Sequence, residues 1–377
     1  MRQARLAALA ALAAFLAAGP LEAAIDVVIN YDYDASGFFG AAYPERRALM
    51  EQAAGTVSRF LDDLDPIVPG GSNTWSARFF YEIDGSYTEV QNPVVSADTL
   101  LVYVRGQDFG AGGHLGHAGP GGYYSWGSAA WNETVAYRGE AGAKLAQPTD
   151  IGRWGGSITF NSNANLPWHF GATTAGLGWN EFDFLSTAIH ELVHVLGFGV
   201  PGSGLSWDTF ALTGKFTGPK AQAEGSPNNP DLQLYGDLAH WKEGTLSTVA
   251  GAQAEASLDP TLTNGDRKRL TRLDFAALDD LGWDLAMAGD TDCDGDVDAV
   301  DLASLGLGWN PAGETAVWAG GDTDGDGDVD AVDLASLGLA WNPAGYAGGS
   351  PLAAPEPGTL ALLAAGLVGL ARARRRP

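Results

Sequence analysis

Apolar residues recur at helical spacing in three stretches of the chain, and each stretch predicts an amphipathic helix. The first covers residues 44–64, where the apolar face comprises Leu49, Ala53, Val57, Phe60 and Leu64. The second begins at Asn180 or Asp183, either of which can cap a helix, and ends at Gly197. Its apolar face comprises Leu185, Ala188, Ile189, Leu192 and Leu196. Both helices are therefore expected to bury one face in a core.

The third helix and the strands complete the predicted domain. The helix begins at Thr271, has Asp274 at the N3 position of a capping box and ends at Gly282. Residues 25–31, 76–82 and 99–104 predict strands. A strand, a helix and two more strands before the second helix predict an α+β domain, with a helix behind a mixed sheet and no separate pro-domain.

Both ends of the chain are predicted to be sorting signals. Residues 1–24 carry Arg2 and Arg5, then an apolar stretch over 6–18 and small residues up to Ala24, which is the order of a secretory signal peptide. Residues 355–377 begin with Pro-Glu-Pro, continue with an apolar run over 360–371 and end in an arginine cluster. That run is shorter than the ~20 residues that span a bilayer. A plain C-terminal membrane anchor is the alternative interpretation.

The order Pro-Glu-Pro, apolar run and arginine cluster resembles the PEP-CTERM sorting signal of Gram-negative bacteria. The resemblance implies export, recognition by an exosortase and a final location at the cell surface or in the extracellular matrix. Anchoring by the C-terminal segment would then be transient, with the arginines on the cytoplasmic side.

An acidic motif occurs twice, 32 residues apart (322 − 290). Carboxylates at loop positions 1, 3, 5, 9 and 12, with a backbone carbonyl at position 7 and a glycine at position 6, suit one hard cation. The sequence therefore predicts two calcium sites. The candidate ligands are Asp290, Asp292, Asp294, Asp296, Asp298 and Asp301 in the first copy, and Asp322, Asp324, Asp326, Asp328, Asp330 and Asp333 in the second.

This repeat resembles a dockerin type I module in three respects. Position 12 is aspartate (Asp301, Asp333) instead of glutamate, no helix leads into either loop, and each copy ends in Trp-Asn-Pro. The resemblance implies a small all-α module of two calcium loop–helix units over residues 290–346, with a cohesin-like or matrix partner. Residues 286–289 are the expected hinge and 347–354 the linker to the sorting signal. Cys293 occupies a non-ligating loop position and is given no role.

Composition narrows the classes of partner. The chain has 377 residues, with Lys+Arg 21 against Asp+Glu 46, so its net charge is −25. Without the twelve repeated aspartates it is still −13 (21 − 34). Nucleic acid is therefore excluded as the main partner, because phosphate backbones bind basic surfaces. The single cysteine excludes an intramolecular disulfide and a cysteine-based zinc cluster.

The second helix carries the candidate catalytic residues. His190 and His194 are four residues apart, so both lie on one helix face, where two imidazoles bind one Zn²⁺. Glu191 would then lie beside the metal-bound water and act as its general base in peptide hydrolysis. The sequence therefore predicts a zinc-dependent hydrolase with one catalytic zinc ion.

Zinc requires a third protein ligand. The helix motif resembles the start of the extended metzincin signature, which implies a third histidine three residues after Gly197; that position holds Val200, which cannot ligate a metal. His240 is the only histidine downstream of the helix and is therefore the candidate third ligand. Carboxylates such as Asp208 are the alternative.

These motifs together are similar to those of a matrixin-like or leishmanolysin-like metzincin. The resemblance rests on His-Glu-x-x-His-Val-Leu-Gly-Phe-Gly from residue 190, a delayed His-Trp at 240–241, Leu-Asp-Pro at 258–260 and residues 273–283. It implies a zinc peptidase domain over residues 25–285 with a polypeptide substrate. In leishmanolysin-type members an insertion precedes the third histidine, which fits His240. Residues 156–161 would form the edge strand on the substrate side, and 168–171 would lead toward the helix.

The chain departs from the metzincin pattern at two points. Leu258 occupies the position of the methionine that lies in a turn beneath the zinc, and leucine has a similar volume. No N-terminal cysteine is present to block the metal. Together with Val200, the leucine keeps open a second hypothesis, a catalytically inactive, calcium-dependent surface or matrix protein. The intact Glu191 favours the enzyme.

His114, His117 and His169 are the remaining histidines. We expect them to form hydrogen bonds with the loop backbone, and a structural metal site is the alternative.

Overall fold

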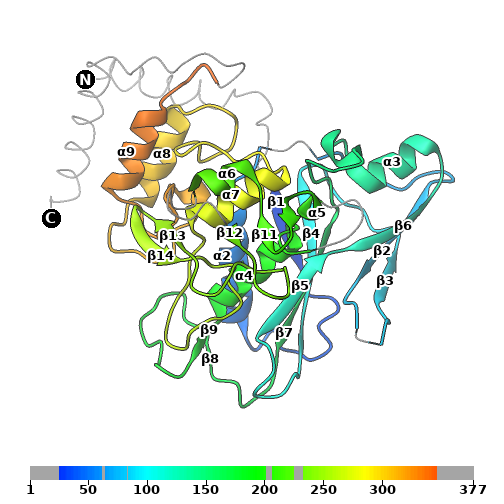
Figure 1. The fold of residues 1–377 in the computed structure, drawn as a ribbon, viewed down its shortest axis with the longest axis horizontal. Helices are drawn as coiled ribbons and strands as arrows, with labels where there is room; N and C mark the ends of the chain where they lie inside the picture. Colours follow the sequence, from blue (N-terminus) through cyan, green and yellow to red (C-terminus); the bar gives the residue numbers. More distant parts are fainter. Residues whose placement is uncertain (1–24, 62–63, 83, 201–205, 225–231, 346–377) are drawn as a thin grey trace, which may run out of the picture.

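The computed structural model describes residues 25–61, 64–82, 84–200, 206–224 and 232–345 (Figure 1). The expected signal peptide, the linker over 347–354 and the sorting signal lie outside these residues.

A four-stranded mixed sheet forms the centre of the domain. Its order is β1 (Asp26–Asn30), β4 (Thr99–Gln107), β7 (Gly155–Asn161) and β5 (Gly116–Pro120). The first three strands are parallel, and β5 pairs antiparallel with β7. The interpretation of residues 156–161 as the edge strand is therefore wrong: β7 is paired on both sides, and β5 is the edge strand.

Successive side chains of β4 point to opposite faces of the sheet and belong to two separate hydrophobic cores. Leu100, Val102 and Val104 face a core shared with α2 (Pro44–Val57), α4 (Phe184–Val195) and α7 (Arg272–Leu281). Tyr103 points to the other face and stacks on Phe79 at a ring-centroid distance of 3.9 Å. The period of two along a strand thus places helices on one face of the sheet and a second sheet on the other.

The second sheet has the order β3 (Thr88–Gln91), β2 (Thr74–Phe79), β6 (Gly122–Trp126), and α3 (Ala129–Tyr137) follows β6. The strand expected over 76–82 is β2, which lies in this sheet and not in the main one. Figure 1 shows these strands at the opposite end of the molecule from α8 (Ala299–Gly308) and α9 (Ala331–Ala340).

Helix α2 ends seven residues earlier than the periodicity predicts (64 − 57). Thr56 and Val57 are β-branched and weaken the last turn. Phe60 then forms a bridge to Leu285, and the Leu61 amide donates to the Asp284 carbonyl at 2.7 Å. Pairing with a distant segment therefore replaces the helical hydrogen bonds that local sequence favours.

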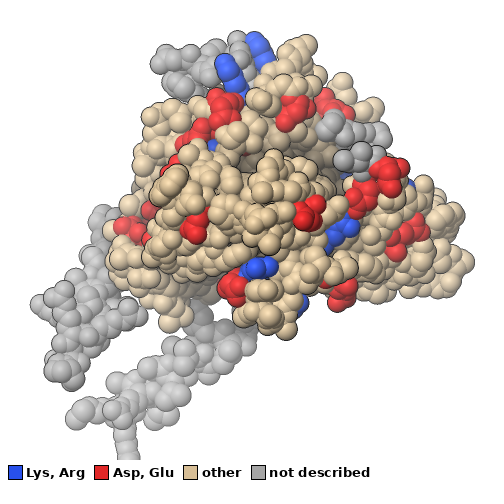
Figure 2. All heavy atoms as spheres, turned by 90° about the horizontal axis from the view of Figure 1, so that it is seen from below, with Lys and Arg blue, Asp and Glu red and all other residues tan. Residues whose placement is uncertain are grey.

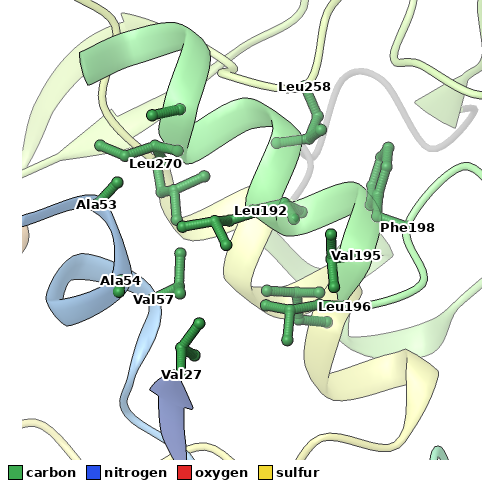
Figure 3. Packing of buried hydrophobic residues seen from close by; sticks show 14 of the residues in the cluster. Val27, Ala53, Ala54, Val57, Leu192, Val195, Leu196, Phe198, Leu258 and Leu270 are labelled. Carbon is green, nitrogen blue, oxygen red and sulfur yellow. The ribbon is translucent and has the colours of Figure 1, made fainter. Parts of the chain in front are cut away.

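The histidine helix α4 is buried almost throughout and packs against α2 (Figure 3). Its predicted cap is confirmed, because the Asp183 side chain accepts from the Ser186 amide at 3.0 Å. Arg267 also donates to both oxygens of Asp183, at 2.9 and 2.7 Å. Gly197 has φ of 103°, which leads the chain out of the helix.

Helix α7 also has the predicted termini. Thr271 and Asp274 form a reciprocal capping box, and the C-cap Gly282 has φ of 111°. The remaining short elements between α3 and α7 are η2 (Gly142–Lys144), β8 (Trp168–His169), β9 (Phe182–Asp183), α5 (Trp207–Phe210), β10 (Ala211–Leu212), β11 (Lys215–Phe216), α6 (Pro219–Glu224), β12 (Leu232–Gln233), β13 (Leu246–Val249) and β14 (Ala252–Glu255).

The acidic repeats form two loop–helix units, α8 and α9, around a small core of their own. Bridges join Val297 to Asn342 and Asn310 to Val329, so each loop pairs with the end of the other unit. The one-turn helix η3 (Trp318–Gly320) lies between the units. The segment expected to be a hinge is packed, because Ala286 is buried and its amide donates to the Arg59 carbonyl at 2.9 Å.

Two surface properties follow from the described residues. None of their helices is both long enough and apolar enough to cross a membrane. On the face shown in Figure 2 the basic side chains are scattered among acidic ones and form no broad positive area, in keeping with the net charge of −25.

Candidate metal site and catalytic site

Three histidines from distant parts of the chain meet beside α4. The Nε2 atoms of His190 and His194 are 3.1 Å apart, and that of His240 lies 3.3 and 3.2 Å from them respectively. The chain therefore returns after 46 residues (240 − 194) to bring His240 beside the helix. We call these residues the three-histidine cluster.

Each ring of the three-histidine cluster is oriented by a hydrogen bond at its other nitrogen. The Nδ1 atoms of His190 and His194 lie 2.7 and 2.8 Å from the carbonyl oxygens of Ser257 and Phe198. Nδ1 of His240 lies 2.8 Å from the Asp237 carboxylate. Because these oxygens only accept, the proton of each neutral ring is on Nδ1. Three unprotonated Nε2 atoms therefore face one another.

Burial favours the neutral form of His190 and His194. It lowers the pKa of His194 to about 4 and, with neighbouring His194 and His240, holds the pKa of His190 well below its ordinary value. Neutral imidazole is the form that ligates metals. Three lone pairs this close repel one another unless a cation lies among them.

The spacing of the three Nε2 atoms fits zinc. Tetrahedral Zn²⁺ with Zn–N distances of ~2.0–2.1 Å separates its nitrogen ligands by about 3.3 Å. The observed separations are 3.1–3.3 Å. The donor set, three imidazoles whose Nδ1 atoms are all hydrogen-bonded, is also one that zinc prefers. The residues present therefore fit the metal that the sequence predicts.

A buried carboxylate organises the turn that supports His190. Asp274 accepts from the Ser257 amide at 3.0 Å, the Trp241 indole at 2.9 Å and the Thr271 amide at 2.8 Å. The same residue thus caps α7, holds the neighbour of His240 and fixes the turn at Ser257–Leu258. Leu258 is fully buried and lies close to α4 (Figure 3). Its expected place beneath the zinc stays a prediction.

Glu191 lies under the edge strand. It is 5% exposed, its Oε2 has no hydrogen-bond partner, and burial raises its pKa to about 8. A Cβ added to Gly116 of β5 would approach Glu191 Oε1 to 2.7 Å. The strand therefore passes so close to the carboxylate that a side chain at position 116 would have to displace it.

A cavity of about 500 Å³ opens beside these groups. The three-histidine cluster and Glu191 line it, and β5 contributes Gly116, His117 and Ala118. The segment after Leu258 contributes Asp259, Pro260 and Leu262 to the lining. The cavity is thus lined both by the last strand of the main sheet and by the candidate catalytic groups.

The other candidate ligands lie elsewhere. Asp208 is on α5 and is not among the described residues that line the cavity, whereas Val200 lines it without a donor atom. Nε2 of His169 lies 3.0 Å from the Thr173 carbonyl, as expected for a histidine that bonds loop backbone. His114 and His117 pack against the ring of Phe109, with centroid distances of 4.2 and 5.5 Å.

The carboxylates of each acidic loop gather in clusters. Asp290, Asp292 and Asp294 have oxygens within 4.8 Å of one another, as do Asp296, Asp298 and Asp301, and Asp322, Asp324 and Asp326 in the second loop. Both oxygens of Asp301 accept hydrogen bonds, from the Thr291 amide and the Asp298 amide, at 2.6 and 2.8 Å. The position-12 aspartate therefore also closes its loop onto the helix.

Several oxygens of these loops lack a donor. Both carboxylate oxygens of Asp292 are buried without a hydrogen-bond partner, as is one oxygen each of Asp296 and Asp328. Burial and the neighbouring aspartates raise the pKa of Asp292 to about 6 and that of Asp322 to about 7. Some carboxylate oxygens of the loops thus have amide donors and others have none, and the oxygens without donors would suit a divalent cation.

Sequence reasoning missed two parts of the site. Strand β5 lies in a glycine-rich stretch that patterning does not identify as a strand, because glycine has low β-propensity. Asp237 received no role, although a carboxylate three residues before a candidate histidine ligand is a recognisable signal for its partner.

Comparison with known proteins supports one segment of the chain. Residues 353–376 match the family model of the PEP-CTERM protein-sorting motif. The motif implies export, exosortase recognition and C-terminal membrane anchoring in Gram-negative bacteria. No curated protein and no solved structure matches the chain.

Proposed function

We propose that the protein is a secreted, zinc-dependent endopeptidase of a metzincin-like type, located at the cell surface or in the extracellular matrix. The observation that carries the proposal is the convergence of three imidazole Nε2 atoms, 3.1–3.3 Å apart, beside Glu191, whose Oε2 has no hydrogen-bond partner. His190, His194 and His240 would hold the metal. When bound, zinc supplies a Lewis acid that lowers the pKa of water and polarises the scissile carbonyl.

Residues of the chain would transfer the proton and hold the three imidazole rings in position. Glu191 accepts the proton of the attacking water and returns it to the amine nitrogen of the leaving peptide. Asp237 and the carbonyls of Ser257 and Phe198 keep the three rings in position. Little solvent reaches Glu191, so bulk water competes only weakly for the proton that this carboxylate transfers.

Strand β5 is the surface along which a polypeptide would bind. It is the last strand of the main sheet, so one side of its backbone is unpaired within the described residues. An extended peptide adds to such an edge through backbone hydrogen bonds. Because β5 lines the same cavity as Glu191 and the three-histidine cluster, a peptide added along it would pass close to these groups.

We also propose that the module over residues 290–346 is dockerin-like and binds two Ca²⁺ ions. The unpartnered oxygens of Asp292, Asp296 and Asp328 support this assignment. A second candidate function, a catalytically inactive surface protein, has support from the same module. Leu307 and Leu339 occupy equivalent positions on α8 and α9 and are 85% and 79% exposed, which suits a cohesin-like or matrix partner.

Metal removal separates the two functions. The purified protein should contain one zinc and two calcium ions per chain and hydrolyse casein. A zinc-selective chelator should remove the zinc and the hydrolysis together, and added zinc should restore both. Elemental analysis and casein turnover on the same samples measure this. A protein that binds calcium but shows no zinc-dependent hydrolysis would instead support the inactive surface protein.

Replacing Gly116 by alanine should impair catalysis without removing zinc. The new methyl group meets the Glu191 carboxylate at 2.7 Å and displaces it, and a shift of about 1 Å in a catalytic group costs about 100-fold in rate. Gly119→Ala on the same strand is the matched control, because its Cβ would meet only Val200, at 3.9 Å. Equal kcat/KM for the two variants would show that β5 does not constrain Glu191.

A further inference from the structure

The acidic module, residues 290–345, lies directly against the domain that carries the three-histidine cluster. We call that domain, within residues 25–285, the three-histidine domain. Trp318, between the two loops, is 2% exposed, and its indole donates to the Asp290 carbonyl at 2.6 Å. Val317 faces α2 so closely that a Cβ at Gly55 would approach it to 3.1 Å. Ala286 and Cys293 are buried in the same cluster as Trp318. Leu61 of the domain packs against this cluster, so the module and the domain are in direct apolar contact.

An arginine of the domain is enclosed at this contact. The guanidinium of Arg59 lies 3.8 Å from the ring centroid of Phe275 on α7 and 4.4 Å from that of Trp318. One ring belongs to the domain and the other to the module, so the cation is held between them. Burial lowers the pKa of Arg59 to about 10, while Asp322 of the second loop is among the acids that oppose this. The contact therefore combines ring stacking with opposite charge.

A second contact reaches the start of the histidine helix. Glu314, between α8 and η3, accepts from the Thr174 amide at 2.6 Å. The loop that contains Thr174 is held by Arg267, which donates to the Gly171 and Ala172 carbonyls at 2.8 and 2.7 Å. Arg267 is also the partner of Asp183, the N-cap of α4. Two sets of hydrogen bonds, joined by the backbone of residues 172–174, thus link the module to the helix that carries His190 and His194.

We propose that residues 290–345 are a brace of the three-histidine domain, that is, a module fixed against its α2–α7 surface, which is their binding partner. Through Glu314 they also stabilise the N-terminal end of α4. A tethered module that moves freely on a hinge would not bury Trp318 or enclose Arg59. The proposal does not depend on peptidase activity, because it concerns the folding of the domain and not its reaction.

Calorimetry of the full chain in calcium-containing buffer tests the brace. We expect one cooperative unfolding transition, because module and domain share a buried contact. Trp318→Ala should lower its midpoint by about 5–10 °C, as expected for a large-to-small change at a buried tryptophan in a chain of this size. Leu307→Ala, an exposed apolar residue of α8, is the control and should leave the midpoint within about 1 °C. Two transitions, with Trp318→Ala moving only one, would overturn the proposal.

Hydrogen exchange tests the link to α4 without a large loss of stability. Glu314 is only partly buried, so Glu314→Ala should still fold. We expect the Thr174 amide and its neighbours to exchange at least about tenfold faster, because the acceptor is lost, while amides of β4 keep their rates. Unchanged exchange at Thr174 would show that the module does not hold this loop.

Discussion

Replacing Glu191 by glutamine is expected to lower kcat for peptide hydrolysis by about 10²–10⁴-fold while leaving the zinc content unchanged. The amide has the size of the carboxylate but cannot accept the proton of the attacking water. Glu191 is not one of the candidate metal ligands in the three-histidine cluster, so the metal should stay bound. Turnover of a peptide substrate and elemental analysis of the same sample measure both effects.

Stability supplies the control for this variant. Glu191 is 5% exposed, has an unpartnered Oε2 and carries a pKa raised to about 8 by burial. A neutral amide should therefore be tolerated, and the melting temperature should not fall. Glu243→Gln makes the same change at an exposed carboxylate that accepts from the Thr261 hydroxyl, and it should retain full activity. Undiminished turnover in Glu191→Gln would remove Glu191 from the mechanism.

Replacing His240 by alanine is expected to abolish zinc binding under conditions in which the unaltered protein is fully loaded. Two imidazoles on one helix face remain, but a catalytic zinc site requires three protein ligands. The loss in affinity should exceed the 10–100-fold that follows from removing an outer partner of a ligand. Asp237→Asn weakens such a partner, and we expect the zinc affinity of this variant to lie between that of His240→Ala and that of the unaltered protein.

His114→Ala is the matched control for the histidine change. This histidine lines the same cavity but packs against Phe109 and takes no part in the three-histidine cluster. It should therefore keep the full zinc content. Full metal occupancy in His240→Ala would assign the third ligand to another residue, and loss of a metal ion in His114→Ala would revive the structural site considered for His114, His117 and His169.

Features within one or two turns of the chain were predictable because their contacts are local. The caps at Asp183, at Thr271 with Asp274 and at Gly282 agree with the sequence, since each is formed by residues three or four positions apart. The placement of His190 and His194 on one face follows from the helical period alone. The selection of His240 rested on exclusion, because the chain has six histidines and only one after the helix.

Features that depend on distant pairing were predicted poorly. Helix α2 stops at Val57 because residues 60–61 pair with 284–285, more than two hundred residues away. Strand β5 exists because β7 offers it backbone partners, although its own sequence is glycine-rich. Residues 156–161 were expected at the sheet edge, but they lie within the sheet because β5 pairs with their outer side.

The amino-acid sequence alone determined which groups carry the candidate chemistry, namely two helical histidines, a glutamate, one later histidine and two acidic loops. It determined this because the helical period and the loop spacing place those groups locally. Only the tertiary structure decided that His240 turns its Nε2 toward the helix, that β5 covers Glu191 and that the acidic module rests on α2 and α7. Those outcomes depend on how separate segments fill one core, and no local pattern encodes that packing.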